Sequence, residues 1–278
     1  MDKRCDLHVH SNCSDGTLSP AELIAEAKKC GLAAIALTDH NTIAGLPEFL
    51  SAAEGGGIRA VPGIEFSADY GGTELHILGL FLRPEHYAAV KEWTDAYLRR
   101  KEESNLALAR NLSKAGYALD YEKVKARTTG IPNRAHFALE LMEMGHLSSI
   151  REGCLTILSP KNGLYTPPAR ATAFETISFI KSIGAAAVLA HPFLNLKEAD
   201  LRIFLKEAKP FGLDAMETLY STFDETLTAK AIAIAKEFGL KQSGGSDFHG
   251  SNKPDISMGI GRGHLAIPLE FLERLETC

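Results

Sequence analysis

Segments of strand length alternate with helical segments at both ends of this chain, and this alternation limits the fold more than any other feature. The expected strands are 5–10, 33–38, 59–67, 74–82, 186–190, 212–218 and 241–243. The expected helices are 19–30, a segment ending near 54, 173–183, 196–209 and 223–238. Such an alternation predicts an α/β fold with a parallel sheet, either open or closed into a barrel.

The middle of the chain interrupts this pattern. Residues 83–159 have a helical pattern rich in Lys, Arg, Glu, Ala and Leu, and the pattern at 160–168 indicates a loop. Because the strand–helix alternation then resumes, we predict a barrel domain built from residues 1–82 and 166–278. A helical subdomain is inserted at 83–165, and we expect it to contribute to the substrate pocket.

Charge and cysteine content narrow the class of protein. The formal net charge of −5 gives no overall basic field that would attract nucleic acid, although a local basic pocket would suffice for a nucleotide. The five cysteines are odd in number and irregularly spaced, which indicates reduced thiols and a cytoplasmic location. We expect no signal peptide and no membrane span. The sequence leaves the oligomeric state open.

Histidines and carboxylates recur where the expected strands end, which is the face that carries the chemistry in β/α barrels. Side chains at i and i+2 of a strand point to the same side, so His8 and His10 can hold one ion together. Asp247 and His249 have the same spacing in an extended loop. The complete set is His8, His10, Asp15, His40, Glu65, His76, His191, Asp247 and His249.

These nine residues together predict a metal site. A single histidine on a strand is more often a core or surface residue than a ligand, but nine such residues in register with strand ends are not independent accidents. Imidazole and carboxylate ligands together suit zinc, iron or manganese. Nine ligands exceed the needs of one ion, so we expect two or three divalent ions, with a carboxylate such as Glu65 bridging. Ions about 4 Å apart can stabilise both the attacking and the leaving oxygen in phosphoryl transfer.

Short motifs surround all nine residues. They are DLHVHS at 6–11, SDG at 14–16, LTDHN at 37–41, PGIEFS at 62–67, HILG at 76–79, AHP at 190–192 and GSDFH at 245–249. In this order they resemble the motifs of the PHP (polymerase and histidinol phosphatase) superfamily. The resemblance runs from Asp6 to about Gly261, which is nearly the whole chain.

The resemblance implies a distorted (β/α)7 barrel that binds three metal ions. It assigns His8, His10, Glu65 and Asp247 to one ion, Glu65, His76 and His191 to a second, and Asp15, His40 and His249 to the third. Asp39 would orient His40 or its loop, and a helix-capping role is equally compatible with its position.

Three further segments resemble the nucleotide-acting branch of this superfamily: PNRAHFA at 132–138, KNGLYTP at 161–167 and ETLYS at 217–221. Members of that branch remove phosphate from nucleoside 3′,5′-bisphosphates or trim short RNA from the 5′ end. By this resemblance Arg134, His136, Lys161 and Tyr220 would bind substrate, and a guanidinium matches phosphate oxygens well. Asn162 after Lys161, and Thr218-Leu219 before Tyr220, depart from the branch pattern and leave the exact substrate open.

Three hypotheses follow. The first is a phosphoric-ester hydrolase for nucleoside 3′,5′-bisphosphates or the 5′ end of short single-stranded RNA, with metal-bound water as the nucleophile and no further catalytic side chain. The second is a small-metabolite phosphatase, such as one for histidinol phosphate, which would not need the motif around Arg134 and His136. The third is a non-catalytic binding module, which the loss of several ligands would have favoured.

Overall fold

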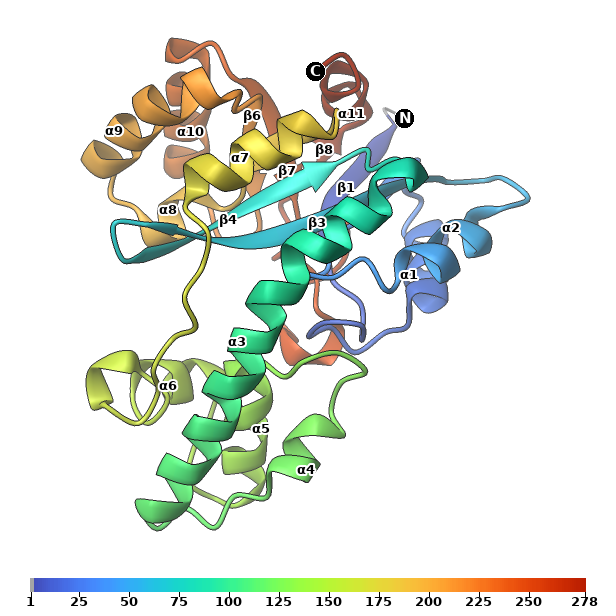
Figure 1. The fold of residues 1–278 in the computed structure, drawn as a ribbon. Helices are drawn as coiled ribbons and strands as arrows, with labels where there is room; N and C mark the ends of the chain where they lie inside the picture. The colour runs from blue at the N-terminus through green and yellow to red at the C-terminus, as the bar shows by residue number, and fades with distance from the viewer. Residues whose placement is uncertain (1–2) are drawn as a thin grey trace.

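Eight strands form one mixed sheet in the computed structural model, which describes residues 3–278 (Figure 1). The strands are β1 (Arg4–Val9), β2 (Ala34–Leu37), β3 (Arg59–Tyr70), β4 (Thr73–Leu80), β5 (Ala186–Leu189), β6 (Ala215–Tyr220), β7 (Lys241–Gly245) and β8 (Ile267–Pro268). Their order across the sheet is β7-β6-β5-β4-β3-β2-β1-β8. The sequence predicted the first seven strands, and only the short β8, antiparallel to β1, was missed.

The sheet curls until β1 and β7 nearly meet. Phe248, just beyond β7, forms a parallel bridge with Val9. The backbone N–H of His10 donates to the Phe248 carbonyl at 2.9 Å, and the N–H of Asp247 donates to the His8 carbonyl at 2.8 Å. These bonds close the seam at the carboxyl ends of β1 and β7, so the predicted distorted β/α barrel is confirmed.

The alternation predicted a parallel sheet, but the sequence also placed a turn at Gly71-Gly72 between the strands expected at 59–67 and 74–82, and the structure departs from a parallel sheet there, at β4. Gly71 and Gly72, both with positive φ, join β3 and β4 as a hairpin. β4 therefore runs antiparallel to β3 and also to β5. The physical reason is that a parallel return needs a long crossover, usually a helix, and two glycines cannot supply one.

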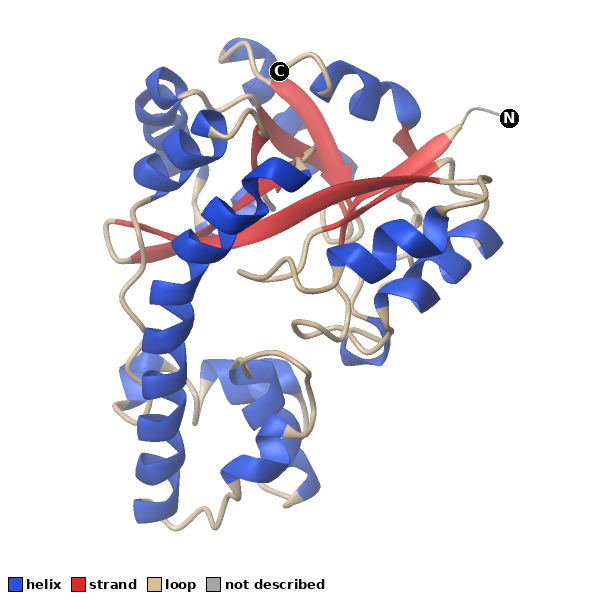
Figure 2. Cartoon of the chain, turned by 45° about the vertical axis from the view of Figure 1, so that its right-hand side comes forward, coloured by secondary structure: helices blue, strands red, loops and turns tan. Residues whose placement is uncertain are grey.

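Helices cover the outside of the barrel (Figure 2). They are α1 (Pro20–Lys29), α2 (Leu46–Ala53), α7 (Ala173–Ser182), α8 (Pro192–Asn195), α9 (Glu198–Ala208), α10 (Glu225–Glu237) and α11 (Leu269–Leu275). Capping boxes begin α1 at Ser19 and α7 at Thr172, where each cap hydroxyl accepts from the N–H three residues later. None of the helices within residues 3–278 is both long and apolar enough to cross a membrane.

The inserted segment forms a helical body beside the barrel, below it in Figure 1. Its helices are α3 (Tyr87–Lys114), α4 (Tyr121–Lys125), α5 (Arg134–Glu143) and α6 (Ile150–Leu155). The 28 residues of α3 extend about 42 Å and belong to both bodies. Val90 packs in the main barrel core, whereas Leu108 and Leu112 join a separate core with Phe137. This second core supports the proposed subdomain at 83–165.

Candidate active site

All nine predicted ligands lie around one point, where the barrel faces the insert. Their nitrogen and oxygen atoms form four groups in which the donor atoms lie within 4.8 Å of one another. The groups are His10, Asp15, His40 and His249; His8, Glu65 and His191; His8, His10 and Asp247; and His40, Glu65 and His76. The strands bring together donors from both ends of the chain, as strand-end positions in a closed barrel require.

Glu65 lies at the centre of these groups and is fully buried. Its Oε1 lies 2.8 Å from His76 Nδ1 and 3.1 Å from His191 Nε2. Its Oε2 lies 2.9 Å from His40 Nδ1 and 3.3 Å from His10 Nε2. His8 Nε2 also lies 3.3 Å from Oε1, so one carboxylate faces five imidazoles, which is the arrangement of a bridging ligand.

The electrostatics of the cluster match a site for cations. Burial opposes charge on His8, but Glu65, Glu217 and Asp247 raise its pKa well above the usual value. His76 is buried as well, and Glu65 beside it raises its pKa to about 10. Burial likewise opposes charge on Glu65, but its imidazole neighbours hold the pKa of that carboxyl well below the usual range. Positive charge is therefore favoured at His8 and His76, whereas burial lowers the pKa of His191 and of His249, and a bound divalent ion would replace the protons on the first two.

Unpaired buried atoms test whether this donor set fits metal ions. Within residues 3–278, the Nδ1 atoms of His10, His40 and His76 and the Oε2 atom of Glu65 are buried and make no hydrogen bond of suitable geometry, although Glu65 lies 2.9 Å from His40 Nδ1 and 2.8 Å from His76 Nδ1. Unpaired buried polar atoms are costly, and metal coordination is one way to satisfy them. Imidazole and carboxylate together fit zinc, iron or manganese.

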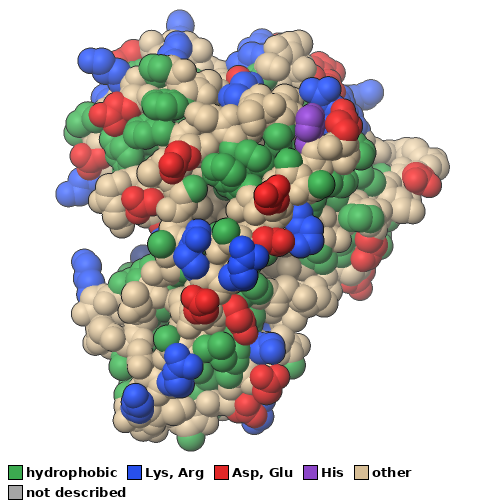
Figure 3. Space-filling model, in the orientation of Figure 1, with side chains coloured by type: hydrophobic (Ala, Val, Ile, Leu, Met, Phe, Trp, Pro, Cys, Tyr) green, Lys and Arg blue, Asp and Glu red, His purple; other side chains and the backbone are tan. Residues whose placement is uncertain are grey.

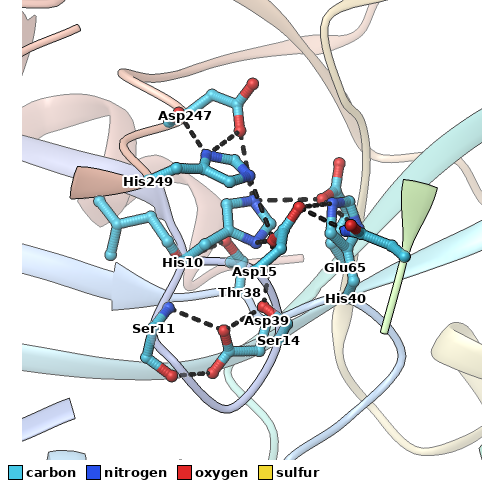
Figure 4. A network of polar contacts seen from close by, with 12 residues as sticks. His10, Ser11, Ser14, Asp15, Thr38, Asp39, His40, Glu65, Asp247 and His249 are labelled. Atoms are coloured by element: carbon cyan, nitrogen blue, oxygen red, sulfur yellow. Dashed lines mark hydrogen bonds and ion pairs between the residues drawn. The ribbon is translucent and has the colours of Figure 1, made fainter. Parts of the chain in front are cut away.

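Two buried aspartates hold the loops that carry ligands. Asp39 accepts hydrogen bonds from the Ser11 N–H at 2.8 Å and from the hydroxyls of Ser11 and Ser14 at 2.5 Å (Figure 4). Asp6 binds Ser246 in the same way, at 2.8 Å to its N–H and 2.5 Å to its hydroxyl. Asp39 was expected to orient His40 or to cap a helix. Instead it fixes the loop leading to Asp15, because two serine hydroxyls and an N–H converge on its carboxylate.

Glu217 is a buried member of the site that the sequence analysis missed. Its Oε1 lies 3.0 Å from His8 Nδ1, and its Oε2 accepts the N–H of His191 at 2.6 Å. One carboxylate therefore orients two candidate ligands from different strands. Glu217 belongs to the ETLYS segment at 217–221, but its role depends on His8 and His191, which lie on other parts of the chain, so nothing in the local sequence indicated it.

Tyr220 was predicted to bind substrate, but its hydroxyl has a different partner. It is buried and donates to Asp247 Oδ2 at 2.6 Å. Lys253 donates to the same oxygen at 2.6 Å. Both side chains thus hold one oxygen of Asp247, while Asp247 Oδ1 lies 3.3 Å from His10 Nε2. In this structure Tyr220 orients a candidate ligand.

A hollow of about 740 Å³ separates the nine-residue cluster from the insert, and we call it the insert-side hollow. In Figure 3 the surface is notched on the left between barrel and insert. Arg134, which was predicted to bind substrate, lines this hollow, with its guanidinium 5.3 Å from the centre of the Tyr165 ring. Lys101 and Arg170 also line it, and neither was predicted. Three cations therefore face one hollow beside the candidate ligands.

His136 and Lys161 do not line this hollow, contrary to prediction. His136 is buried, and its Nδ1 accepts the N–H of Asn133 at 3.0 Å, completing a capping box at the start of α5. Burial lowers the pKa of His136 to about 4, so it offers phosphate no charge near neutral pH. Lys161 is exposed in a short 3-10 turn at Pro160–Asn162. Asn133 instead links the insert to the cluster, donating to Asp15 at 2.6 Å.

Comparisons with known proteins agree with this geometry. The sequence profile of the PHP domain matches residues 6–151. The chain is 33% identical to a 5′-3′ exoribonuclease of Haemophilus influenzae, over 90% of this chain and 91% of that protein. It is 30% identical to a 3′,5′-nucleoside bisphosphate phosphatase of Chromobacterium violaceum, over 88% and 86% of the two chains.

A solved structure shows the same fold. An amidohydrolase from Chromobacterium violaceum, with bound sulfate and no metal, has a TM-score of 0.88 and 27% identity, over 99% of this chain and 96% of that one. Its fold, the profile match and the curated relatives all point the same way. The chain belongs to the PHP domain family and is a phosphoric-ester hydrolase whose His, Asp and Glu clusters could hold metal ions.

Proposed function

We propose that this enzyme removes the 3′-phosphate from nucleoside 3′,5′-bisphosphates and trims short single-stranded RNA from its 5′ end. The observation that carries this proposal is the insert-side hollow, where Lys101, Arg134 and Arg170 lie beside the donor cluster. A substrate with one phosphate at the cluster has a second phosphate to place, and cations suit it. The names of two relatives favour the same substrates.

Each part of the site has a proposed role. The nine donors would hold two to three ions of manganese, iron or zinc, grouped as the family resemblance implies. When bound, such ions supply hydroxide near neutral pH and neutralise charge on the phosphoryl oxygens. Glu217 fixes the orientation of His8, and Tyr220 fixes that of Asp247. Arg134, held against Tyr165, would bind the second phosphate.

A small-metabolite phosphatase is the competing proposal. A monophosphate such as histidinol phosphate has no second phosphate. The three cations of the insert-side hollow would then have no anionic group of the substrate to bind. Purified enzyme supplied with manganese should release phosphate from adenosine 3′,5′-bisphosphate faster than from histidinol phosphate. The opposite preference would reject the nucleotide proposal.

Arg134→Ala tests the second-phosphate role directly. Hydrogen bonds to charged groups contribute about 1.5–3 kcal/mol, so kcat/KM for adenosine 3′,5′-bisphosphate should fall about 10- to 100-fold. Activity on a nucleoside 3′-monophosphate should fall much less. Arg151→Ala is the matched control, because Arg151 is an exposed residue of α6 that does not line the hollow. Equal losses on both substrates would remove Arg134 from this role.

A further inference from the structure

A second hollow, of about 890 Å³, meets the first at the donor cluster. His40, Glu74, His76 and Arg134 line both hollows. The second hollow is also lined by Leu194 and Asn195 of α8, so we call it the α8-side hollow. A phosphate at the cluster therefore has space on two sides, whereas a mononucleotide needs only one.

One wall of the α8-side hollow is formed by α8, which begins directly after the candidate ligand His191. His191 has a left-handed backbone (φ 30°), which turns the chain from β5 directly into α8. Leu194 follows three residues later, and its N–H donates to the His191 carbonyl at 2.9 Å. Asn195 donates to the Glu74 carbonyl at 2.6 Å and ties α8 to the β3–β4 hairpin. Leu194 is 51% exposed on this fixed wall.

The charges of the two hollows differ. The insert-side hollow has three cationic side chains and a single carboxylate, Glu74, which pairs with Arg170 at 2.7 Å. Among the described residues, Lys101 and Arg134 therefore remain free of carboxylate partners there. The α8-side hollow shares Arg134 and Glu74 with it, its other two carboxylates are the candidate metal ligands Glu65 and Asp247, and its own cation, Lys253, is already paired with Asp247. A terminal phosphate carries up to two negative charges near neutral pH, whereas an internal phosphodiester carries one. The terminal 5′-phosphate of RNA therefore suits the insert side, and the continuing strand suits the α8 side.

We infer that the α8-side hollow, with Leu194, Asn195 and Lys253 on its wall, holds the nucleotide that follows the scissile phosphate of RNA. Exposed Leu194 offers an apolar surface to the sugar or base of that nucleotide. This inference rests on the proposed function and deepens it, because it separates the contacts that RNA makes from those that a bisphosphate makes.

The direction of binding has a chemical consequence. Water adds to phosphorus, the bond from phosphorus to the ribose O3′ breaks, and O3′ takes a proton. A nucleoside 5′-monophosphate leaves the insert side, and the remaining strand keeps the phosphoryl group as a new 5′-phosphate. The shortened product thus has the same end group as the substrate, so trimming can repeat on the same strand.

Leu194→Glu tests this subsite in the metal-loaded enzyme. A carboxylate on the wall would repel the phosphates of the downstream strand, so KM for a short 5′-phosphorylated oligoribonucleotide should rise about fivefold at low salt. Hydrolysis of adenosine 3′,5′-bisphosphate should change less than about twofold, since that substrate ends at the scissile phosphate. Leu194→Gln is the matched control, because the glutamine side chain has nearly the same shape as that of glutamate but carries no charge.

A binding assay supplies an independent readout. Fluorescence anisotropy with labelled 5′-phosphorylated RNA and metal-free protein should show the same order of affinities, with Leu194→Glu protein binding more weakly than Leu194→Gln and wild-type protein. Equal effects of Leu194→Glu on RNA and bisphosphate, or no effect on RNA, would overturn the inference. Wild-type enzyme that cleaves bisphosphate but not RNA would overturn it too. Failure on both substrates would instead reject the proposed function.

Discussion

Replacing Glu217 by glutamine should weaken metal binding without unfolding the protein. His8 Nε2 faces Glu65 and Asp247, at 3.3 and 3.7 Å, so Nε2 is the nitrogen available to an ion. The other nitrogen, Nδ1, must then carry the proton and donate it to Glu217. Glutamine has one oxygen for two donors, the His8 ring and the His191 backbone. One N–H would therefore face the amide NH2 and lose its acceptor.

The size of this effect follows from the lost bond. A buried donor left without an acceptor costs about 1–3 kcal/mol, and changes to residues that orient ligands typically lower metal affinity about 10- to 100-fold. Competition with a chromophoric chelator would measure manganese and zinc affinity of wild-type and Glu217→Gln protein. Glu207→Gln, on the exposed side of α9, is the control and should leave affinity unchanged. An unchanged affinity in folded Glu217→Gln protein would refute the reasoning.

Two further predictions concern stability and backbone packing. Because burial lowers the pKa of His136 from its ordinary 6.5 to about 4, the unfolded chain takes up this proton first as the pH falls, and stability is lost between those values. His136→Gln can keep the cap of α5 but does not titrate. In urea unfolding, the wild type should therefore lose about 2 kcal/mol more free energy of unfolding than the variant between pH 7 and pH 5. Equal losses in the two proteins would contradict this. Gly245→Ala would place a Cβ 2.1 Å from His8 Cβ, so we expect metal content by atomic absorption to collapse. Gly79→Ala is the control and should retain its metal, because the added Cβ would lie 3.4 Å from the nearest side-chain atoms. A Gly245→Ala protein with full metal content would show the packing argument to be wrong.

The donor cluster could be predicted because its signal is local. His8, His40 and His191 each lie at or directly after a strand, and a strand-end position implies a place in the barrel before any contact is known. The sequence could not predict Lys101 and Arg170 in the insert-side hollow. They lie on different elements, 69 residues apart, and only the packing of α3 against the barrel brings them to one surface.

His136 shows a different cause of error. The segment Asn133 to His136 has the spacing of a capping box, with a histidine where glutamate or glutamine is usual. The Nδ1 atom of His136 therefore accepts a hydrogen bond from the backbone N–H of Asn133, although His136 was predicted to bind substrate. Glu217 was missed because its role depends on the neighbouring strands β5 and β1, and the positions of those strands follow from the closed barrel.

The hydrogen bonds between Asp6 and Ser246 join residues 240 positions apart. Among the eight strands described, β1 leaves the ribosome before the others, and β7, which positions Asp247, comes after the other long ones. His8 and His10 therefore exist early in synthesis without the partner that completes their group. A nascent or truncated chain lacking Asp247 cannot assemble this group, so loading of the full site must wait until β7 and the residues directly after it have been made.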